Sequence, residues 1–198
     1  MLSSYQACFC LITLLLFSAC GQRAEDPSGV PVMAFEVNEA LLGEAVRLDA
    51  HGLVFSPPRG WKGASADLLE EINTTVFEKE ASVRQESIKV FYDADAGSFL
   101  SVTLVQVDGG GSFEEQTEQF ANLLSSQQTS VSYRKAAFNK DGLHLVQFMG
   151  QSQGMINFKL LLASGGGDLL QFDYVVPMAH YPEQVKAVES SIGSLQRR

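Results

Sequence analysis

Two neighbouring stretches near the C-terminal end alternate strictly between apolar and polar residues. The apolar members are Ile156, Phe158, Leu160 and Leu162 in the first stretch and Leu170, Phe172, Tyr174 and Val176 in the second. The polar members between them are Asn157, Lys159, Gln171 and Asp173. This period of two is typical of β-strands with one apolar face. Such a face needs a helical layer over it, and the polar side chains are expected to form an opposite, polar face.

The two stretches belong to a predicted antiparallel meander of four strands. Turn-forming residues separate its strands at 139–142, 151–154 and 164–168. A hairpin is predicted before the meander, from Ile88 to Tyr92 and from Phe99 to Val107. A shorter strand, Leu53 to Phe55, stops at two prolines that cannot donate to a sheet.

Three amphipathic helices are predicted around these strands. Ser65 can cap the first, over 66–78, and Ser112 with Glu115 forms a capping box for the second. The third runs from Tyr181 to Leu195 with Arg197 and Arg198 at its C-terminal end, where the helix dipole favours cations. The segment 40–46 fits either a helix or a strand. The predicted fold class is α+β: a mostly antiparallel sheet of about five to seven strands covered by amphipathic helices.

One motif adds a family resemblance. Val54-Phe55-Ser56 is followed by Pro58-Arg59-Gly60-Trp61, and a capped helix, a strand meander and a closing helix come after it. The order resembles the DcrB/PsbP-like family, whose α/β domains occur in many bacterial envelope lipoproteins. The resemblance covers residues 45–198 and implies an α/β/α-type sandwich with a non-catalytic role. Trp61 is expected to anchor packing, with a ligand-stacking role as the alternative.

A second resemblance concerns the N-terminus. The apolar run Phe9 to Ala19 is too short to span a bilayer, and Phe17-Ser18-Ala19-Cys20-Gly21 resembles the lipobox of bacterial lipoproteins. It implies a signal peptide at 1–19, acylation of Cys20, and a cell-membrane or outer-membrane protein facing the periplasm or the exterior. Residues 20–44 are expected to form the lipidated N-terminus and a flexible tether.

The cysteines and the charges agree with an anchored, acidic domain. Cys8 and Cys10 lie inside the segment to be removed, so the mature chain has no second cysteine for a disulfide. All charged residues follow Cys20, and the net charge is −9. An acidic surface repels phosphates, which excludes nucleic acid as a partner and leaves the acyl chains as the means of attachment to the lipid bilayer.

Several motifs invite a catalytic or metal-binding interpretation. Gly150 to Gly154 matches G-x-S-x-G, and Asp168 or Asp173 with His180 would complete a Ser152 triad. A nucleophile elbow, however, needs a strand-to-helix turn, and a hairpin loop is predicted here. The Asp93-x-Asp95-x-Gly97 string has Leu104 where a calcium loop needs a glutamate. No catalytic, cofactor-binding or metal-binding residue is therefore predicted.

The predicted function is a lipid-anchored extracytoplasmic lipoprotein with a non-catalytic binding or accessory module. Its contact surface is expected on the uncovered face of the sheet or in a groove beside Trp61, and its ligand or envelope protein partner stays open. Two alternatives are kept: an envelope serine hydrolase that uses Ser152, and a chaperone-like module that shields apolar helices of a client protein.

Overall fold

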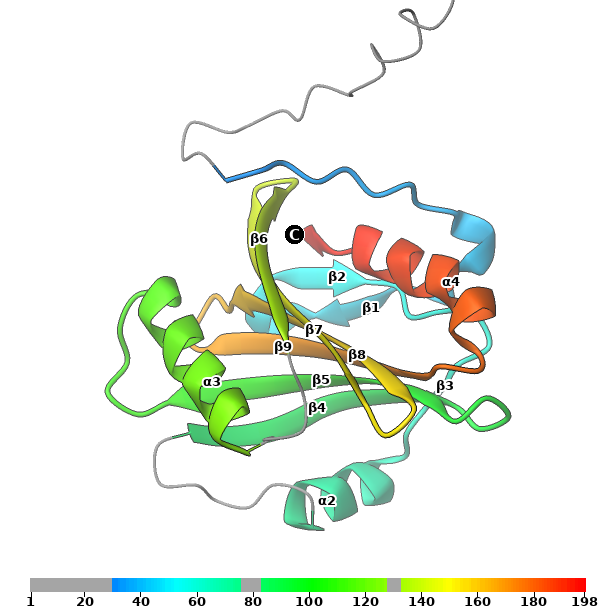
Figure 1. Ribbon diagram of the computed structural model, residues 1–198, viewed down its shortest axis with the longest axis horizontal. Helices are drawn as coiled ribbons and strands as arrows, with labels where there is room; N and C mark the ends of the chain where they lie inside the picture. Colours follow the sequence, from blue (N-terminus) through cyan, green and yellow to red (C-terminus); the bar gives the residue numbers. More distant parts are fainter. Residues whose placement is uncertain (1–29, 76–82, 128–132) are drawn as a thin grey trace, which may run out of the picture.

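The computed structural model describes residues 30–75, 83–127 and 133–198, and these form a central antiparallel sheet of seven strands (Figure 1). The strand order is β3-β4-β5-β9-β8-β7-β6. The bounds are β3 Lys62–Gly63, β4 Val83–Asp93, β5 Ser98–Val107, β6 Arg134–Lys140, β7 Leu143–Ser152, β8 Met155–Ala163 and β9 Leu169–Pro177. The predicted α+β class and its antiparallel sheet are confirmed.

Tight turns fix the register of the meander. β6 and β7 are joined by Asp141 and Gly142, with φ of 48° and 75°, and β7 and β8 by Gln153 and Gly154, with φ of 49° and 77°. Two consecutive left-handed residues are typical of the two-residue turn whose twist matches that of the flanking strands. The turn residues therefore place β6, β7 and β8 side by side, as the sequence predicted.

A second, small sheet is formed by three strands that are not hydrogen-bonded to the large sheet. It contains β1 Val46–Leu48, β2 Leu53–Phe55 and β10 Gln196–Arg197 in the order β1-β2-β10. The sequence fitted either a helix or a strand over 40–46. In the structure, this segment contains the end of a short 3₁₀ helix, η1 Glu39–Leu41, and the start of β1. A second 3₁₀ helix, η2 Asp49–His51, joins β1 to β2.

The end of the closing helix differs from the prediction. Helix α4 spans Tyr181–Gly193, so Arg197 lies on β10 and Arg198 follows it. The Arg198 amide donates to the Gly52 carbonyl at 3.0 Å, and its guanidinium pairs with Asp49. The prediction that both arginines sit at a helix end was wrong because pairing with β2 takes over after Gly193.

The other two helices begin at the predicted caps. Ser65 Oγ accepts from the Leu68 amide at 3.3 Å at the start of α2, which is described over Ala66–Thr75. At the start of α3, Phe113–Gln127, Ser112 Oγ accepts from the Glu115 amide at 3.2 Å, and Glu115 Oε2 accepts from the Ser112 amide at 2.8 Å. The reciprocal bonds confirm the capping box.

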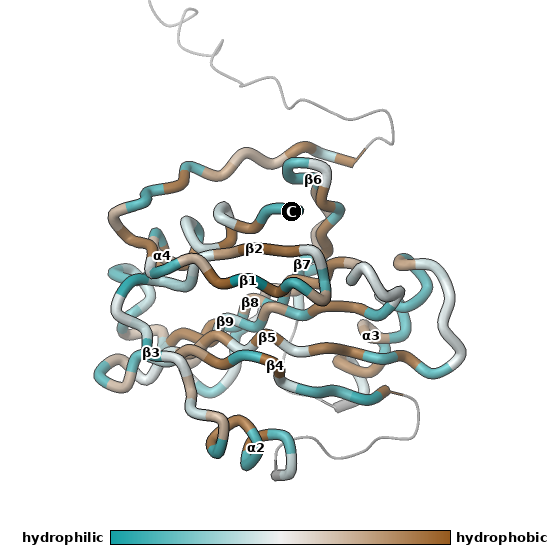
Figure 2. Tube along the Cα trace, turned by 180° about the vertical axis from the view of Figure 1, so that it is seen from behind, coloured by the Kyte–Doolittle hydropathy of each residue, from teal (hydrophilic) through white to brown (hydrophobic). Residues whose placement is uncertain are grey.

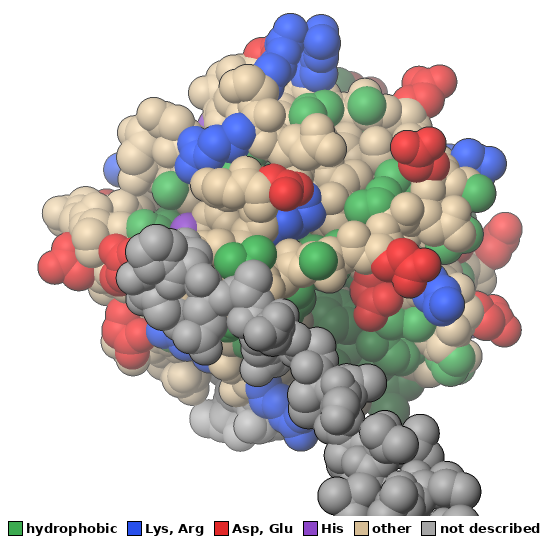
Figure 3. All heavy atoms as spheres, turned by 90° about the horizontal axis from the view of Figure 1, so that it is seen from above, with side chains coloured by type: hydrophobic (Ala, Val, Ile, Leu, Met, Phe, Trp, Pro, Cys, Tyr) green, Lys and Arg blue, Asp and Glu red, His purple; other side chains and the backbone are tan. Residues whose placement is uncertain are grey.

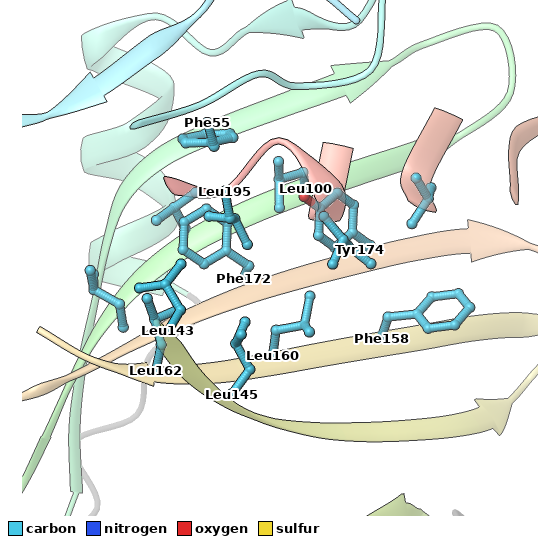
Figure 4. Packing of buried hydrophobic residues seen from close by; sticks show 14 of the residues in the cluster. Phe55, Leu100, Leu143, Leu145, Phe158, Leu160, Leu162, Phe172, Tyr174 and Leu195 are labelled. Carbon is cyan, nitrogen blue, oxygen red and sulfur yellow. The ribbon is translucent and has the colours of Figure 1, made fainter. Parts of the chain in front are cut away.

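The large sheet has a hydrophobic core on each side. Helix α4 and the small sheet cover one face, where the main core gathers Phe55, Leu100, Phe172, Tyr174 and Leu195, all under 2% exposed (Figure 4). Helix α3 covers part of the other face, where its Phe120 and Leu124 pack with residues such as Val105 and Leu161. The hydrophobic character of β2 and β5 is visible along the chain trace (Figure 2). Layers on both faces make the molecule a sandwich.

A bulge lets β4 contribute to both cores. Ser87 pairs with Thr103 and Lys89 pairs with Val102, so Ile88 is an extra residue in the strand. Before the bulge, Val83 packs in the α3-side core; after it, Phe91 packs against the main core. The extra residue therefore exchanges the two faces of the strand.

The residues before the small sheet lie along the domain. We name residues 31–38 the strap. The Met33 amide donates to the Asn139 carbonyl at 2.9 Å, and the Asn139 amide donates to the Pro31 carbonyl at 3.0 Å. Phe35 packs on Phe138 with ring centroids 5.7 Å apart, and the Asn38 amide donates to Ser190 Oγ at 3.1 Å. This part of the expected tether is thus held against β6 and α4.

Candidate functional site

The residues predicted to anchor the protein lie outside the described part of the chain. These are Cys20, the expected signal peptide 1–19 and the first residues of the tether. Within the described ranges, none of the helices combines the length and the apolar character needed to cross a bilayer. Acylation of Cys20 stays a prediction.

A groove of about 610 Å³ lies where the strap, β2 and the end of α4 meet. Its lining comes from segments far apart in the sequence. Val37 and Glu39 come from the strap and η1, Val54 and Arg59 from β2 and the residues after it, and Ser194 and Gln196 from the chain after α4. The groove combines aliphatic side chains with a guanidinium, a carboxylate and an amide, a mixture suited to a ligand with apolar and polar parts.

Arg59 is the charged donor of the groove. Its Nε donates to the Leu42 carbonyl at 3.2 Å and its Nη2 to the Glu39 carbonyl at 3.4 Å. A guanidinium carries five N–H donors, so two of them hold the side chain in place and the others are available to a partner. Arginine presents these donors in a fixed plane that suits a carboxylate or another anionic group.

A serine network joins the wall of the groove to the core. Ser194 Oγ accepts from the Ser56 amide at 2.8 Å, and Ser191 Oγ donates to the Ser56 carbonyl at 2.7 Å. Ser191 also bonds the hydroxyl of Tyr174 at 2.9 Å, inside the main core. Burial raises the pKa of Tyr174 far above its usual value of 10. The groove is therefore connected by hydrogen bonds to the core.

Trp61 is half-buried and packs against the main core. Arg59, two residues earlier in the same motif, is the member that lines the groove. The motif that carried the family resemblance thus contributes one packing side chain and one charged groove residue. A ligand-stacking role for Trp61 stays a prediction.

The residues of the serine-hydrolase alternative lie in a different arrangement from a nucleophile elbow. Ser152 is the last residue of β7 and pairs with Met155 across the two-residue turn to β8. Asp168 precedes β9 and contacts Gln106, whereas Asp173 is paired with Lys159. His180 is the residue immediately before α4, and its side chain makes no capping hydrogen bond there. Ser152 therefore lies on a strand-to-strand turn, which lacks the helix N-terminus that the mechanism uses.

The aspartates of the Asp93-x-Asp95-x-Gly97 string and the histidine of β7 both lie in structural contacts. Asp93 Oδ1 accepts from the amides of Asp95 and Ala96, which closes the β4–β5 turn. His144 shares a 2.7 Å hydrogen bond with Asn139 and meets the Phe113 ring edge to face. Across residues 30–75, 83–127 and 133–198, no group of three or more His, Cys, Asp or Glu side chains could hold a metal ion.

The polar face expected on β8 and β9 is largely covered at Lys159, Gln171 and Asp173. Lys159 and Asp173 form a salt bridge with side chains 12% and 14% exposed, and Gln171 is 5% exposed. Among the described residues, Gln171 Oε1 and Asp173 Oδ1 have no hydrogen-bond partner, and burial raises the pKa of nearby Tyr133. The expected open sheet face was therefore wrong for these residues. They offer no open surface to a ligand or a client helix.

Comparison with known proteins supports the fold. No family model matches the sequence, and no curated protein matches it. Among solved structures, the chain is similar to cyanobacterial PsbP (CyanoP) from Synechocystis sp. PCC 6803, with a TM-score of 0.51, 14% identity, and coverage of 84% of this chain and 98% of that chain. The chain has a PsbP-like fold. At this identity the likeness shows the fold alone, and it confirms that part of the predicted resemblance.

A protein from Bacteroides thetaiotaomicron VPI-5482 is also similar, with a TM-score of 0.40, 14% identity, and coverage of 79% of this chain and 48% of that chain. This TM-score is too low to support a shared fold.

Proposed function

We propose that this chain is a lipid-anchored extracytoplasmic lipoprotein whose PsbP-like domain is a non-catalytic accessory module. It binds its partner in the groove between the strap, β2 and the end of α4. The groove is the observation that carries the binding role, because it is preformed and joins apolar walls to an oriented arginine. The sequence around Cys20 supports the anchor.

The groove indicates the chemistry of its partner. Val37, Leu42 and Val54 give apolar contact, and Arg59 adds a positive charge on a protein whose net charge is −9. A partner that places an aliphatic side chain beside a carboxylate satisfies both features. This partner is an envelope protein segment or a small molecule of that kind.

The anchor is tested by the intact mass of protein extracted from membranes. The expected mass is that of residues 20–198 plus acyl groups, and Cys20→Ser should give a chain without the acyl mass. Recovery of wild-type protein with residues 1–19 attached and no added mass would contradict the anchor.

The groove is tested by photo-crosslinking in intact cells. A photoreactive amino acid at Gln196, inside the groove, should give one defined adduct, whereas the same amino acid at Glu71, exposed on α2, should not. Arg59→Gln should weaken the adduct while the fold is kept. Equal adducts at both positions would contradict the groove as the binding surface.

A further inference from the structure

We propose that the strap end of the domain faces the bilayer surface and that α2 is presented away from it. This orientation rests on the proposed acylation of Cys20. In this orientation the lipid surface is next to the strap end of the domain. The orientation follows from the way in which the strap is held against β6 and α4.

The strap fixes the point at which the chain leaves the domain. Pro31 and Met33 are hydrogen-bonded to Asn139 on β6, and Phe35 packs on Phe138. Behind the strap, Gly193 of α4 lies so close that a Cβ there would come within 2.7 Å of Val37 and 2.8 Å of Phe35. The chain therefore leaves the domain at a defined place beside β6.

Few residues separate that place from the anchor. Ten residues, 21–30, lie between Cys20 and Pro31. Cys20 and Pro31 are thus eleven Cα–Cα steps apart, a chain that spans at most ~40 Å at full extension and on average ~17–20 Å as a coil. A domain of this size is roughly 40 Å across. If α2 faced the membrane, this chain would have to be stretched to its limit along the whole domain to reach Pro31, whereas a strap end beside the bilayer requires no such extension.

The strap end also carries exposed apolar side chains. Val32 and Met33, at the start of the strap, are 39% and 37% exposed. Figures 1 and 2 both place the strap at the end of the domain opposite α2. Seen from the strap side, hydrophobic side chains are interspersed with acidic and basic ones (Figure 3). Such a surface suits the interface between water and headgroups.

The net charge of −9 opposes adsorption of the free domain on anionic lipid, so the orientation depends on the covalent anchor. A variant that begins at Gly21, and so lacks both the apolar run and the acylated cysteine, should stay unbound when mixed with vesicles of phosphatidylcholine and phosphatidylglycerol. Binding of that variant would show that the surface itself adsorbs, and it would overturn the anchor-driven orientation.

The orientation can be measured with one fluorescent label at a time. Once residues 1–19 are removed and Cys20 is acylated, the mature chain has no free thiol, so an engineered cysteine is its single labelling site. Glu36→Cys puts the label on the strap and Glu71→Cys puts it on α2. Both replace an exposed glutamate and change the charge equally. The acylated protein is placed in vesicles with nitroxide-labelled headgroups.

The label at position 36 should be quenched several-fold more strongly than the label at position 71. Equal quenching, or stronger quenching at 71, would overturn the orientation while the acyl mass still supports the anchor. The parent protein without an engineered cysteine must take up no label. If it does, Cys20 carries a free thiol, and the proposed anchor and the orientation both fail.

A second experiment releases the strap from the domain. Phe35→Ala removes its packing on Phe138 and should lengthen the free chain, so the difference in quenching between positions 36 and 71 should shrink. A retained far-ultraviolet spectrum shows that the domain is folded. An undiminished difference would overturn the role of the strap.

Discussion

Lys159 on β8 and Asp173 on β9 lie directly opposite each other and form a salt bridge in the interior of the molecule. Their side chains are 12% and 14% exposed, and the second carboxylate oxygen of Asp173 has no hydrogen-bond partner within residues 30–75, 83–127 and 133–198. The stability of the folded protein therefore depends on both charges, because burying either one without the other costs free energy.

Lys159→Met should destabilise the protein by about 3 kcal/mol, since it leaves the Asp173 carboxylate buried without its cation. Urea unfolding measures the change. The double variant Lys159→Met with Asp173→Leu should recover most of the loss. Lys135→Met is the matched control. It breaks the exposed pair with Glu118 and should cost less than about 1 kcal/mol. Equal losses for the two lysines would contradict the importance of burial.

The buried hydroxyl of Tyr174 should make the protein sensitive to alkali. Burial raises the pKa of Tyr174 in the folded protein above the value of about 10 expected when unfolded. The folded state therefore keeps a proton that the unfolded state loses, and the free energy of unfolding should fall as the pH rises above about 10. Below that pH this contribution is constant. Urea midpoints from pH 7 to pH 11 measure the fall.

Tyr174→Phe separates this effect from general alkaline denaturation. It should cost about 1 kcal/mol at pH 7, because the hydrogen bond to Ser191 is lost, and its stability should decline less steeply above pH 10. The same slope in both proteins would assign the alkaline transition to another group.

Gly193→Ala should loosen the strap. Alanine in a helix is normally favourable by about 1 kcal/mol over glycine, but the added methyl group would press on Val37 and Phe35. We expect a net loss of about 1–2 kcal/mol, as for an overpacked core. Amide exchange at Met33, which donates to Asn139, should become faster. Glu189→Ala, exposed on the same helix, should change neither quantity.

A fluorophosphonate probe should not label the folded protein at Ser152. The serine lies on the β-hairpin that joins β7 to β8 and not at a strand-to-helix turn. Gel fluorescence with a known serine hydrolase as positive control measures this. Labelling of wild type that disappears in Ser152→Ala would restore the hydrolase alternative.

Local signals in the sequence were sufficient for much of the fold. The capping box of Ser112 and Glu115 and the turn at Asp141-Gly142 depend on residues within a few positions of each other, and both are confirmed. The alternation of Leu160 and Phe172 with polar residues gave the strands and their apolar face. Each of these patterns depends on residues that are close together in the sequence, so it forms the same local structure whatever packs around it.

Long-range contacts decided what the sequence could not. Alternation assigned Lys159 and Asp173 to an open polar face, although their pairing and burial depend on layers contributed from elsewhere in the chain. The same holds for the groove. Arg59 was visible in a motif, but Val37 and Gln196 reach it only through the folded chain. The residues next to Val37 and Gln196 in the sequence form no pattern that predicts a groove at these positions.

The extra residue at Ile88 has a practical consequence for anyone who aligns this chain with distant homologues. A homologue with an uninterrupted β4 would need a one-residue gap at Ile88. Without that gap, every position from Val83 to Ser87 would be matched to the wrong side of the strand, and buried positions would be scored as solvent-facing ones.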